Sequence, residues 1–324
     1  MKYRKLGTTG IIVSEVGFGT WGIGGLSSGA TSYGQTDDEV SCQALRRAYE
    51  LGITFFDTSD IYGYGHSEYL IGKTLRDVRK KIVIASKVGF LEHRGFWDFS
   101  CQHIEESIEA TFKRLQADYL DVYQLHSPPI ELIEKDSRIV DCLRKLKKAG
   151  KIRALGISVR APEDALVAVG KLGFDCVQFN FSLVDQRAKE AGVFEFCCKR
   201  NIGVIIRTPL CFGFLTGKYT SSTQFDQRDH RSTWSQEQRE LWSNAYKLFL
   251  ATLMKKNDQS GTQLALRFCL SLKGVSTVIP GMLNKEEVEE NVLASGLDLF
   301  SNFELKQIYQ IYKDNTFFLG RDKK

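Results

Sequence analysis

Short apolar runs recur along the chain, and polar or amphipathic segments separate them. Eight runs of about 4 to 6 residues predict β-strands at residues 16–19, 53–56, 82–86, 120–125, 154–157, 176–179, 203–206 and 276–279. Between them, apolar residues repeat with the i, i+3, i+4 spacing of amphipathic helices, for example at residues 38–50, 104–115, 137–149, 163–169 and 189–199. Connections of this length hold helical crossovers, so the strands are expected to run parallel.

The alternation predicts an α/β protein. Eight β/α units in one uninterrupted series indicate a closed (β/α)8 TIM barrel, formed as a single domain over residues 1–324. An open doubly wound sheet is the alternative, because the pattern does not determine closure. Residues 3–14 predict an N-terminal β-hairpin around a Gly-Thr-Thr-Gly turn, and residues 302–315 predict an extra C-terminal helix.

Two irregular stretches interrupt the pattern, at residues 88–100 and 210–235. Loops of this length in a compact domain are usually lids, binding loops or disordered segments. The first contains Phe90 and Trp97 just after a predicted strand. These aromatic side chains could line a pocket or attach the loop to the barrel, and the sequence does not separate the two.

Composition narrows the class of protein. The chain has 324 residues, 43% of them hydrophobic, with 44 basic and 39 acidic residues. A mean hydropathy of −0.22 suits a soluble globular protein. The small charge excess favours neither nucleic acid nor membrane as a partner. No apolar run is long enough to span a bilayer, and the N-terminus does not have the pattern of a secretory signal. A cytoplasmic location is therefore expected.

The eight cysteines do not form a recognisable metal or disulfide pattern. No C-x-x-C occurs, and no Cys/His cluster has zinc spacing. Most lie in apolar contexts, where cysteine behaves as a small hydrophobic residue. We expect reduced thiols and no bound metal.

A glycine motif near the N-terminus resembles a dinucleotide fingerprint. Gly17-Phe-Gly-Thr-Trp-Gly matches G-x-G-x-x-G, and Asp37 follows twenty residues after Gly17. In a Rossmann turn this motif opens a helix. Here Ile-Gly-Gly-Leu-Ser-Ser-Gly follows, which is not a helix-forming segment. We expect these glycines to allow close backbone approach at the end of the first barrel strand.

Four residues carry the candidate chemistry. Asp57, Lys87 and His126 directly follow predicted strands, and Tyr62 lies five residues after Asp57. Barrel enzymes place their catalytic residues at the carboxyl ends of the strands. Each residue alone has an ordinary structural explanation, such as a turn cap or a packing contact. Their occurrence on consecutive strands predicts one site.

These residue types together suit proton transfer. A phenol has a pKa of about 10, and a nearby ammonium lowers it by favouring the phenolate. We expect Lys87 to act in this way on Tyr62, with Asp57 holding the ammonium. Tyr62 can then serve as general acid toward a carbonyl oxygen, which His126 helps to polarise. Such a site has no electron source of its own, so a reductase of this design needs a hydride cofactor.

The chain strongly resembles the aldo-keto reductases over nearly its whole length. The resemblance is carried by Gly17-Phe-Gly-Thr-Trp, Phe56-Asp-Thr-Ser-Asp-Ile-Tyr-Gly, Ala85-Ser-Lys-Val-Gly, Asp121-Val-Tyr-Gln-Leu-His, Lys151-Ile-Arg-Ala-Leu-Gly-Ile-Ser, Gln178-Phe-Asn, Leu215-Thr-Gly-Lys-Tyr and Val278-Ile-Pro-Gly. It implies a (β/α)8 barrel that binds an extended nicotinamide dinucleotide without a Rossmann motif.

The resemblance also implies roles for individual residues. Tyr62 matches the proton donor, with Lys87 and Asp57 as its supporting pair and His126 orienting the carbonyl. The implied substrate-binding set is Trp21, Tyr62, Phe90, Trp97 and His126. The implied cofactor-binding set is Gly19, Thr20, Trp21, Asp57, Ser158, Gln178, Arg207, Pro209, Leu210, Gly217, Lys218, Pro280, Gly281, Met282, Asn284, Glu287, Glu290 and Asn291. Within it, Ser158 and Gln178 match the carboxamide site, Gly217 and Lys218 the pyrophosphate cover, and Glu290 and Asn291 the adenine site.

Three positions depart from the family pattern. Val159 stands where an asparagine is common, and Asn180 is a candidate to replace its carboxamide contact. Arg207 stands where many members stack an aromatic ring on the nicotinamide. Glu287 stands at a frequently basic position, where a carboxylate would repel a 2′-phosphate. The family favours NADP(H), and Glu287 keeps NAD(H) open as the cofactor.

The sequence thus predicts an NAD(P)H-dependent oxidoreductase that reduces an aldehyde or ketone, including sugars and their derivatives. An NAD-dependent aldose or alcohol dehydrogenase running in the oxidative direction uses the same residues. A nucleotide-binding regulatory barrel subunit, as found with potassium channels, is an alternative of another class. A nucleotide-binding barrel without chemistry is a further one, suggested by the departures at Val159 and Arg207.

Overall fold

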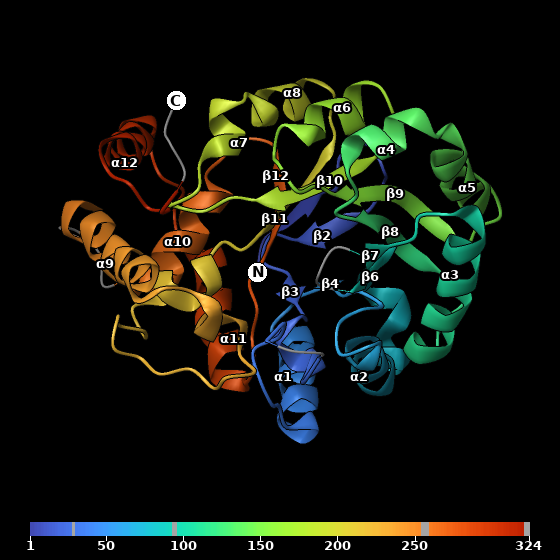
Figure 1. Ribbon diagram of the computed structural model, residues 1–324, viewed down its shortest axis with the longest axis horizontal. Helices are drawn as coiled ribbons and strands as arrows, with labels where there is room; N and C mark the ends of the chain where they lie inside the picture. Colours follow the sequence, from blue (N-terminus) through green and yellow to red (C-terminus); the bar gives the residue numbers. More distant parts are fainter. Residues whose placement is uncertain (28–29, 93–95, 254–258, 321–324) are drawn as a thin grey trace.

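The computed structural model describes residues 1–27, 30–92, 96–253 and 259–320 (Figure 1). Its centre is an eight-stranded parallel sheet in the order β12-β11-β10-β9-β8-β5-β4-β3. The strands are β3 (Phe18–Gly19), β4 (Phe55–Asp57), β5 (Val83–Val88), β8 (Leu120–His126), β9 (Ile152–Ser158), β10 (Cys176–Asn180), β11 (Gly203–Arg207) and β12 (Val275–Ile279). All eight coincide with predicted strands.

The sheet closes on itself. The amide of Gly17 donates to the carbonyl of Val278 (2.8 Å), and the amide of Gly19 donates to that of Pro280 (2.9 Å). These bonds join β3 to β12, the two ends of the sheet. A side chain at residue 19 would prevent them, because a Cβ there would lie 2.7 Å from the carbonyl oxygen of Ile279. The prediction of a closed barrel is confirmed, and the open sheet is excluded.

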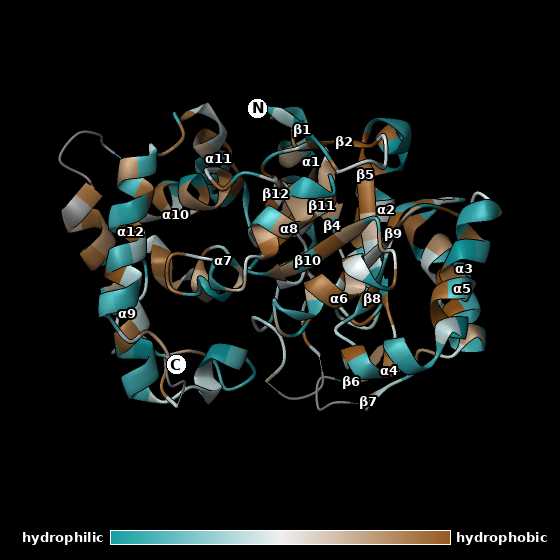
Figure 2. Ribbon diagram, turned by 90° about the horizontal axis from the view of Figure 1, so that it is seen from above, coloured by the Kyte–Doolittle hydropathy of each residue, from teal (hydrophilic) through white to brown (hydrophobic). Residues whose placement is uncertain are grey.

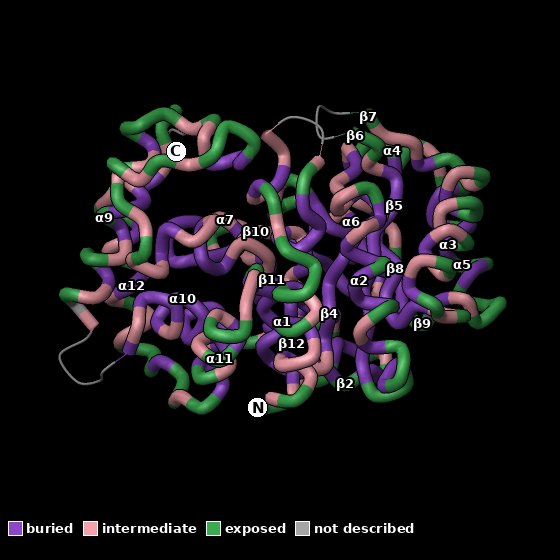
Figure 3. Tube along the Cα trace, turned by 90° about the horizontal axis from the view of Figure 1, so that it is seen from below, coloured by how far each residue is buried: buried purple, intermediate pink, exposed green. Residues whose placement is uncertain are grey.

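Helices surround the barrel on all sides (Figure 1). They are α1 (Asp38–Glu50), α2 (His66–Leu75), α3 (Cys101–Leu115), α4 (Ile130–Lys135), α5 (Ser137–Lys148), α6 (Asp164–Gly170), α7 (Arg187–Glu190), α8 (Val193–Lys199), α9 (Gln236–Leu253), α10 (Gly261–Leu270), α11 (Lys285–Leu293) and α12 (Asn302–Asp314). Apolar positions line the faces toward the barrel and polar ones the outer faces (Figures 2 and 3). The extra C-terminal helix is α12, which begins at a capping box between Ser301 and Glu304.

The predicted N-terminal hairpin closes one end of the barrel. Strands β1 (Tyr3–Lys5) and β2 (Ile12–Ser14) pair antiparallel. Leu6, Ile11 and Val13 are fully or almost fully buried and form one apolar cluster with side chains inside the barrel. The hairpin therefore seals the amino-terminal end, and the carboxyl ends of the strands face the other way (Figure 2).

The irregular stretches contain some structure that the sequence did not predict. Within residues 88–100, β6 (Phe90–Glu92) and β7 (Phe96–Trp97) form a small antiparallel hairpin. Within residues 210–235, two 3-10 helices occur, η3 (Cys211–Thr216) and η4 (His230–Thr233). All eight cysteines are free thiols. No helix in the described ranges is both long and apolar enough to cross a membrane.

Candidate active site

The side chains inside the barrel are apolar at one end and polar at the other. Side chains two residues apart on a strand share one face, so each strand contributes an apolar position and then a polar position to the interior. Phe55, Ala85 and Val122 belong to the buried cluster at the hairpin end. The next inward positions on the same strands are Asp57, Lys87 and Gln124. The register of the sheet thus gathers polar groups at the carboxyl end of the barrel.

A cavity of about 330 Å³ opens at this end. Tyr62 and His126 lie at one part of it, and Glu290 and Asn291 on α11 lie at another. The predicted site residues that line it are Gly19, Thr20, Trp21, Asp57, Tyr62, Phe90, His126, Ser158, Gln178, Arg207, Pro209, Leu210, Lys218, Pro280, Gly281, Glu287, Glu290 and Asn291. Most of the residues that the sequence assigned to separate roles therefore share one cavity.

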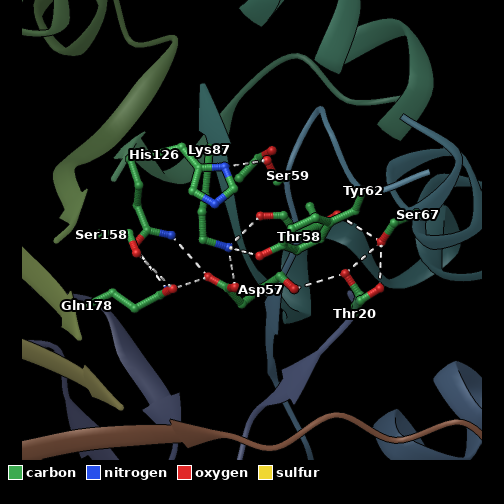
Figure 4. A network of polar contacts seen from close by, with 12 residues as sticks. Thr20, Asp57, Thr58, Ser59, Tyr62, Ser67, Lys87, His126, Ser158 and Gln178 are labelled. Atoms are coloured by element: carbon green, nitrogen blue, oxygen red, sulfur yellow. Dashed lines mark hydrogen bonds and ion pairs between the residues drawn. The ribbon is translucent and has the colours of Figure 1, made fainter. Parts of the chain in front are cut away.

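Asp57, Lys87 and Tyr62 form a continuous hydrogen-bonded chain (Figure 4). The Lys87 ammonium donates to the Asp57 carboxylate and to the carbonyl of Thr58 (2.8 Å). Its third contact is the Tyr62 hydroxyl, at 3.3 Å. Lys87 is 1% exposed and Asp57 is 2% exposed, so the ion pair is excluded from solvent. The ammonium uses all three of its N–H groups and is fixed in place.

The surroundings of Tyr62 raise its pKa above the ordinary value of a phenol. Burial raises the pKa of the phenol, Lys87 lowers it, and the net shift is upward. The sequence-based expectation of a lowered pKa is therefore wrong for this arrangement, because burial outweighs the ammonium. Burial lowers the pKa of Lys87, but Asp57 and Tyr62 outweigh that effect and leave it raised. Tyr62 is a neutral phenol and Lys87 a cation at neutral pH.

Gln124 supports the Asp57 carboxylate and was not predicted from the sequence. Its Nε2 donates to Asp57 Oδ2 (3.0 Å), and Gln178 Nε2 donates to the same oxygen (2.7 Å). Ser158 Oγ donates to Gln178 Oε1 (3.4 Å). The alternation of the run Leu120 to His126 could have identified Gln124, since it shares a face with His126.

His126 lies at the end of β8 and contacts Tyr62 and Phe90. The rings of Tyr62 and His126 are 5.9 Å apart in an edge-to-face arrangement, and those of Phe90 and His126 are 5.4 Å apart. The hydroxyl of Ser59 lies 3.0 Å from His126 Nδ1 (Figure 4). Because Nδ1 faces Ser59, Nε2 is the nitrogen of this ring that can reach a substrate.

Arg207 is fixed by polar contacts with β10 and with the residue that follows β9. Its guanidinium donates to the side-chain oxygen of Asn180 and to the carbonyl of Val159 (3.0 Å). The same Asn180 oxygen accepts from Thr208 Oγ1 (2.8 Å). Asn180 therefore positions Arg207 and is not one of the cavity-lining residues, in contrast to its expected role as a carboxamide contact. Burial lowers the pKa of Arg207.

At the α11 end of the cavity, Lys218 spans the gap between the loop after β11 and the helix. Its ammonium lies 3.7 Å from Glu287 and 3.5 Å from Glu290. Glu287 also accepts from the amide of Leu283 (2.9 Å), which fixes its carboxylate at the start of α11. The position where the family resemblance predicts a basic residue thus carries a carboxylate that is held by Lys218 and by a backbone amide.

The cavity wall after β11 contains a strained backbone. Thr208, Cys211 and Phe212 have φ angles of 60°, 46° and 57°, and Gly213 follows at 94°. Residues other than glycine rarely adopt this region, and such strain concentrates at functional sites. Thr208, Phe212 and Gly213 all line the cavity.

Five predicted site residues do not line the cavity: Lys87, which is buried in the ion pair with Asp57, and four others. Met282 is fully buried in the core, and Asn284 caps α11 by accepting from the amide of Glu287 (2.9 Å). Gly217 ends η3 in a left-handed conformation against Tyr246. The ring of Trp97 lies 4.7 Å from the Arg160 guanidinium. Each of these four is used in packing or capping.

Other cavity residues were not predicted. They are Gly22, Tyr33, Ser127, Thr208, Phe212, Gly213, Thr216, Tyr219, Arg231, Thr262, Ile279 and Leu283. Most of them come from loops and short 3-10 segments whose paths the sequence did not determine, while Ile279 belongs to β12 and Thr262 to α10. One group in the described ranges has the composition of a metal site, namely Cys101, Glu105 and Cys142 between α3 and α5. None of these three lines the cavity.

The family model of the aldo/keto reductase family matches residues 15–313 of the chain. The chain belongs to this family. An aldo-keto reductase of Schizosaccharomyces pombe, specified for NADP(+), is 31% identical over 334 residues, which cover 98% of this chain and 93% of that protein. The NADH-specific methylglyoxal reductase of Escherichia coli is 29% identical over 324 residues, covering 92% of this chain and 95% of that protein.

Solved structures of the family share the fold. The holo form of an aldo-keto reductase from Bacillus halodurans superimposes with a TM-score of 0.79 at 28% sequence identity, covering 99% of this chain and 100% of that one. The (β/α)8 architecture is thus that of the aldo/keto reductases, which are oxidoreductases dependent on nicotinamide dinucleotides. The two relatives named above differ in the dinucleotide that they use.

The residues of the cavity fit an extended dinucleotide. Ser158 and Gln178 offer hydroxyl and amide groups near Tyr62, and Lys218 offers a cation nearer α11. Gly19 and Gly281 line the cavity without side chains. The donor set therefore suits a long ligand with a polar head group and anionic phosphates.

Proposed function

We propose that the protein is an NAD(P)H-dependent reductase of aldehydes or ketones in which Tyr62 is the general acid. The observation that carries this proposal is the Tyr62 hydroxyl, 3.3 Å from the buried Lys87 ammonium and exposed to the cavity. A phenol with a raised pKa keeps its proton at neutral pH until an acceptor arrives. Tyr62 thus carries the proton that the reduction of a carbonyl requires.

The bound dinucleotide would supply the hydride to the carbonyl carbon. Tyr62 donates its proton to the carbonyl oxygen, and the Lys87 cation stabilises the phenolate that forms. Asp57, held by Gln124 and Gln178, keeps Lys87 charged. His126 provides a second hydrogen bond to the same oxygen.

The test is the Tyr62→Phe variant, which removes one oxygen and keeps the ring. We expect dinucleotide affinity, measured by fluorescence titration, to stay within about twofold, while kcat for carbonyl reduction falls by about 10³-fold. Tyr69→Phe is the matched control, because Tyr69 is exposed on α2. The substrate for this assay is first identified by screening aldehydes, ketones and sugars for the oxidation of NADH or NADPH.

Two results would contradict the proposal. Turnover in Tyr62→Phe equal to that of Tyr69→Phe would remove Tyr62 from the chemistry. Dinucleotide binding with no turnover of any carbonyl compound or alcohol would favour the regulatory barrel instead.

A further inference from the structure

The loop between β4 and Tyr62 contains a polar connection that the proposed mechanism does not use. Ser59 is fully buried, and its hydroxyl lies 3.0 Å from His126 Nδ1 and 3.0 Å from Asp60 Oδ1. The amide of Ile61 donates to the same hydroxyl oxygen (3.4 Å). Ser59 therefore joins a carboxyl group to the ring of His126.

A hydroxyl has one proton and two lone pairs, so only two complete arrangements exist here. In one, His126 Nδ1–H donates to Ser59, and Ser59 donates to the ionised Asp60. In the other, a protonated Asp60 donates to Ser59, Ser59 donates to Nδ1, and the imidazole proton is on Nε2. Ile61 donates to Ser59 in both, so Ser59 is satisfied either way.

The two arrangements differ by one proton. The second forms from the first when one proton binds at Nε2, the Nδ1 proton passes to Ser59, and the Ser59 proton passes to Asp60. No atom other than hydrogen moves between partners. The state of Asp60 therefore determines which nitrogen of the neutral ring carries its proton.

We propose that Ser59 is a positioning residue that couples the protonation of Asp60 to the tautomer of His126. With Asp60 protonated, His126 presents an Nε2–H donor, which suits a carbonyl oxygen. With Asp60 ionised, Nε2 is an acceptor, which suits the hydroxyl of an alcohol. The assignment of the two tautomers to a carbonyl and to an alcohol rests on the proposed function, whereas the coupling between Asp60 and His126 does not.

The surroundings of Asp60 place its titration near neutral pH. Burial, and then the negative charge of Glu68, raise the pKa of Asp60 to about 7. Glu68 on α2 is fully buried and pairs with Arg114 on α3 (2.6 Å). Arg114 opposes the shift in Asp60 but is already engaged by Glu68. Tyr123 on β8 also lies near this carboxyl, and burial, followed by the charge of Asp60, raises the pKa of the Tyr123 phenol. Among the described residues no lysine or arginine forms an ion pair with Asp60.

The experiment uses the full chain labelled with ¹⁵N-histidine. The Nδ1 and Nε2 shifts of His126, assigned with a His126→Gln variant, are followed by NMR from about pH 5.5 to about pH 8.5. We expect the proton to move from Nε2 to Nδ1 as the pH rises through about 7. Ser59→Ala and Asp60→Asn should each abolish that movement. Asp164→Asn is the control, because Asp164 is a partly buried carboxyl on α6 whose pKa is also raised.

Kinetics with the carbonyl substrate give a second readout. In the wild type, KM for the carbonyl should rise by about tenfold between pH 6 and pH 8 as the Nε2–H donor is lost, and in Asp60→Asn it should stay flat. If the His126 proton still moved from Nε2 to Nδ1 with rising pH in both Ser59→Ala and Asp60→Asn, the coupling would be overturned. A tautomer change without turnover of any substrate would instead contradict the proposed function and leave the coupling standing.

Discussion

At the scale of single residues, the central feature is an ion pair with almost no exposure to solvent. Removing two charges from water is costly, and the cost is offset only when every polar atom has a partner. Lys87 has three acceptors, and Asp57 accepts from Lys87, Gln124 and Gln178. The buried charges are therefore stable only as a pair. Replacing either residue by a neutral one would leave the other charge buried without its partner.

Replacing Lys87 by methionine should be strongly destabilising. The substitution keeps the volume but leaves Asp57 buried without its cation, so we expect a loss of about 3 kcal/mol in the free energy of unfolding. Urea denaturation measures it. Lys73→Met is the control, because Lys73 is exposed on α2. Equal stability of the two variants would mean that the two glutamine amides alone can hold the Asp57 carboxylate.

Glu287 provides a test of cofactor preference. Its carboxylate lines the cavity and is held by Lys218 and by the amide of Leu283. Glu287→Arg should shift the ratio of NADPH to NADH affinities toward NADPH by about tenfold or more, as measured by fluorescence titration. Glu286→Arg, on the exposed side of α11, is the control. A ratio that moves equally in both variants would locate the 2′-phosphate elsewhere.

Individual residues of the candidate site could be predicted where the strands determine their positions. Asp57, Lys87 and His126 end strands, and their meeting follows from the closed barrel. The pKa of Tyr62 was predicted in the wrong direction, because a sequence displays the neighbouring charge of Lys87 but not the degree of burial. The link through Ser59 was missed for a similar reason: only the folded loop brings its hydroxyl to His126.

At the scale of secondary structure, the N-terminal hairpin is more than a decoration of the barrel. Leu6 projects into the interior cluster, where a Cβ on Gly203 would lie 2.7 Å from it. The hairpin thereby replaces water with apolar side chains at the open end of a hollow sheet. We expect changes in the hairpin to alter the stability of the fold but not ligand binding, because the cavity lies at the opposite end of the barrel.

Leu6→Ala tests that separation. The truncation leaves a cavity in a packed interior and should cost about 3 kcal/mol in the free energy of unfolding. Dinucleotide affinity, measured on the same preparation, should be unchanged. Ile12→Ala is the matched control from the same hairpin, because Ile12 is half exposed and should cost far less. A parallel loss of affinity in Leu6→Ala would show that the two ends of the barrel are coupled.

The elements themselves were largely predictable. Short apolar runs identified all eight barrel strands, a Gly-Thr-Thr-Gly turn indicated the first hairpin, and apolar residues at helical spacing indicated the last helix. The loops were not, because their conformation depends on contacts made after the barrel has formed. The β6–β7 hairpin and the left-handed residues from Thr208 to Gly213 are examples. This also explains why Trp97 was expected on the cavity wall and instead packs against Arg160.

At the scale of the whole molecule, the barrel separates stability from chemistry along its axis. The apolar layer near the hairpin packs the strands together, and the polar layer at the carboxyl ends holds the groups that we propose take part in the reaction. Long loops and α11 then build the walls of the cavity, and the Lys218 contact with Glu287 and Glu290 joins two segments distant in sequence. Single-domain folding, cytoplasmic location and the absence of a metal stay predictions.

The hairpin also determines how this protein can be handled. The N-terminus lies at the end of the molecule opposite the β6–β7 hairpin (Figures 2 and 3). Phe90 of that hairpin lines the cavity, so the N-terminus and the cavity are at opposite ends. An affinity tag, a fluorescent fusion or a linker to a solid support attached at that terminus would point away from the mouth through which ligands pass. Immobilisation through the N-terminus should therefore leave the cavity open to solution.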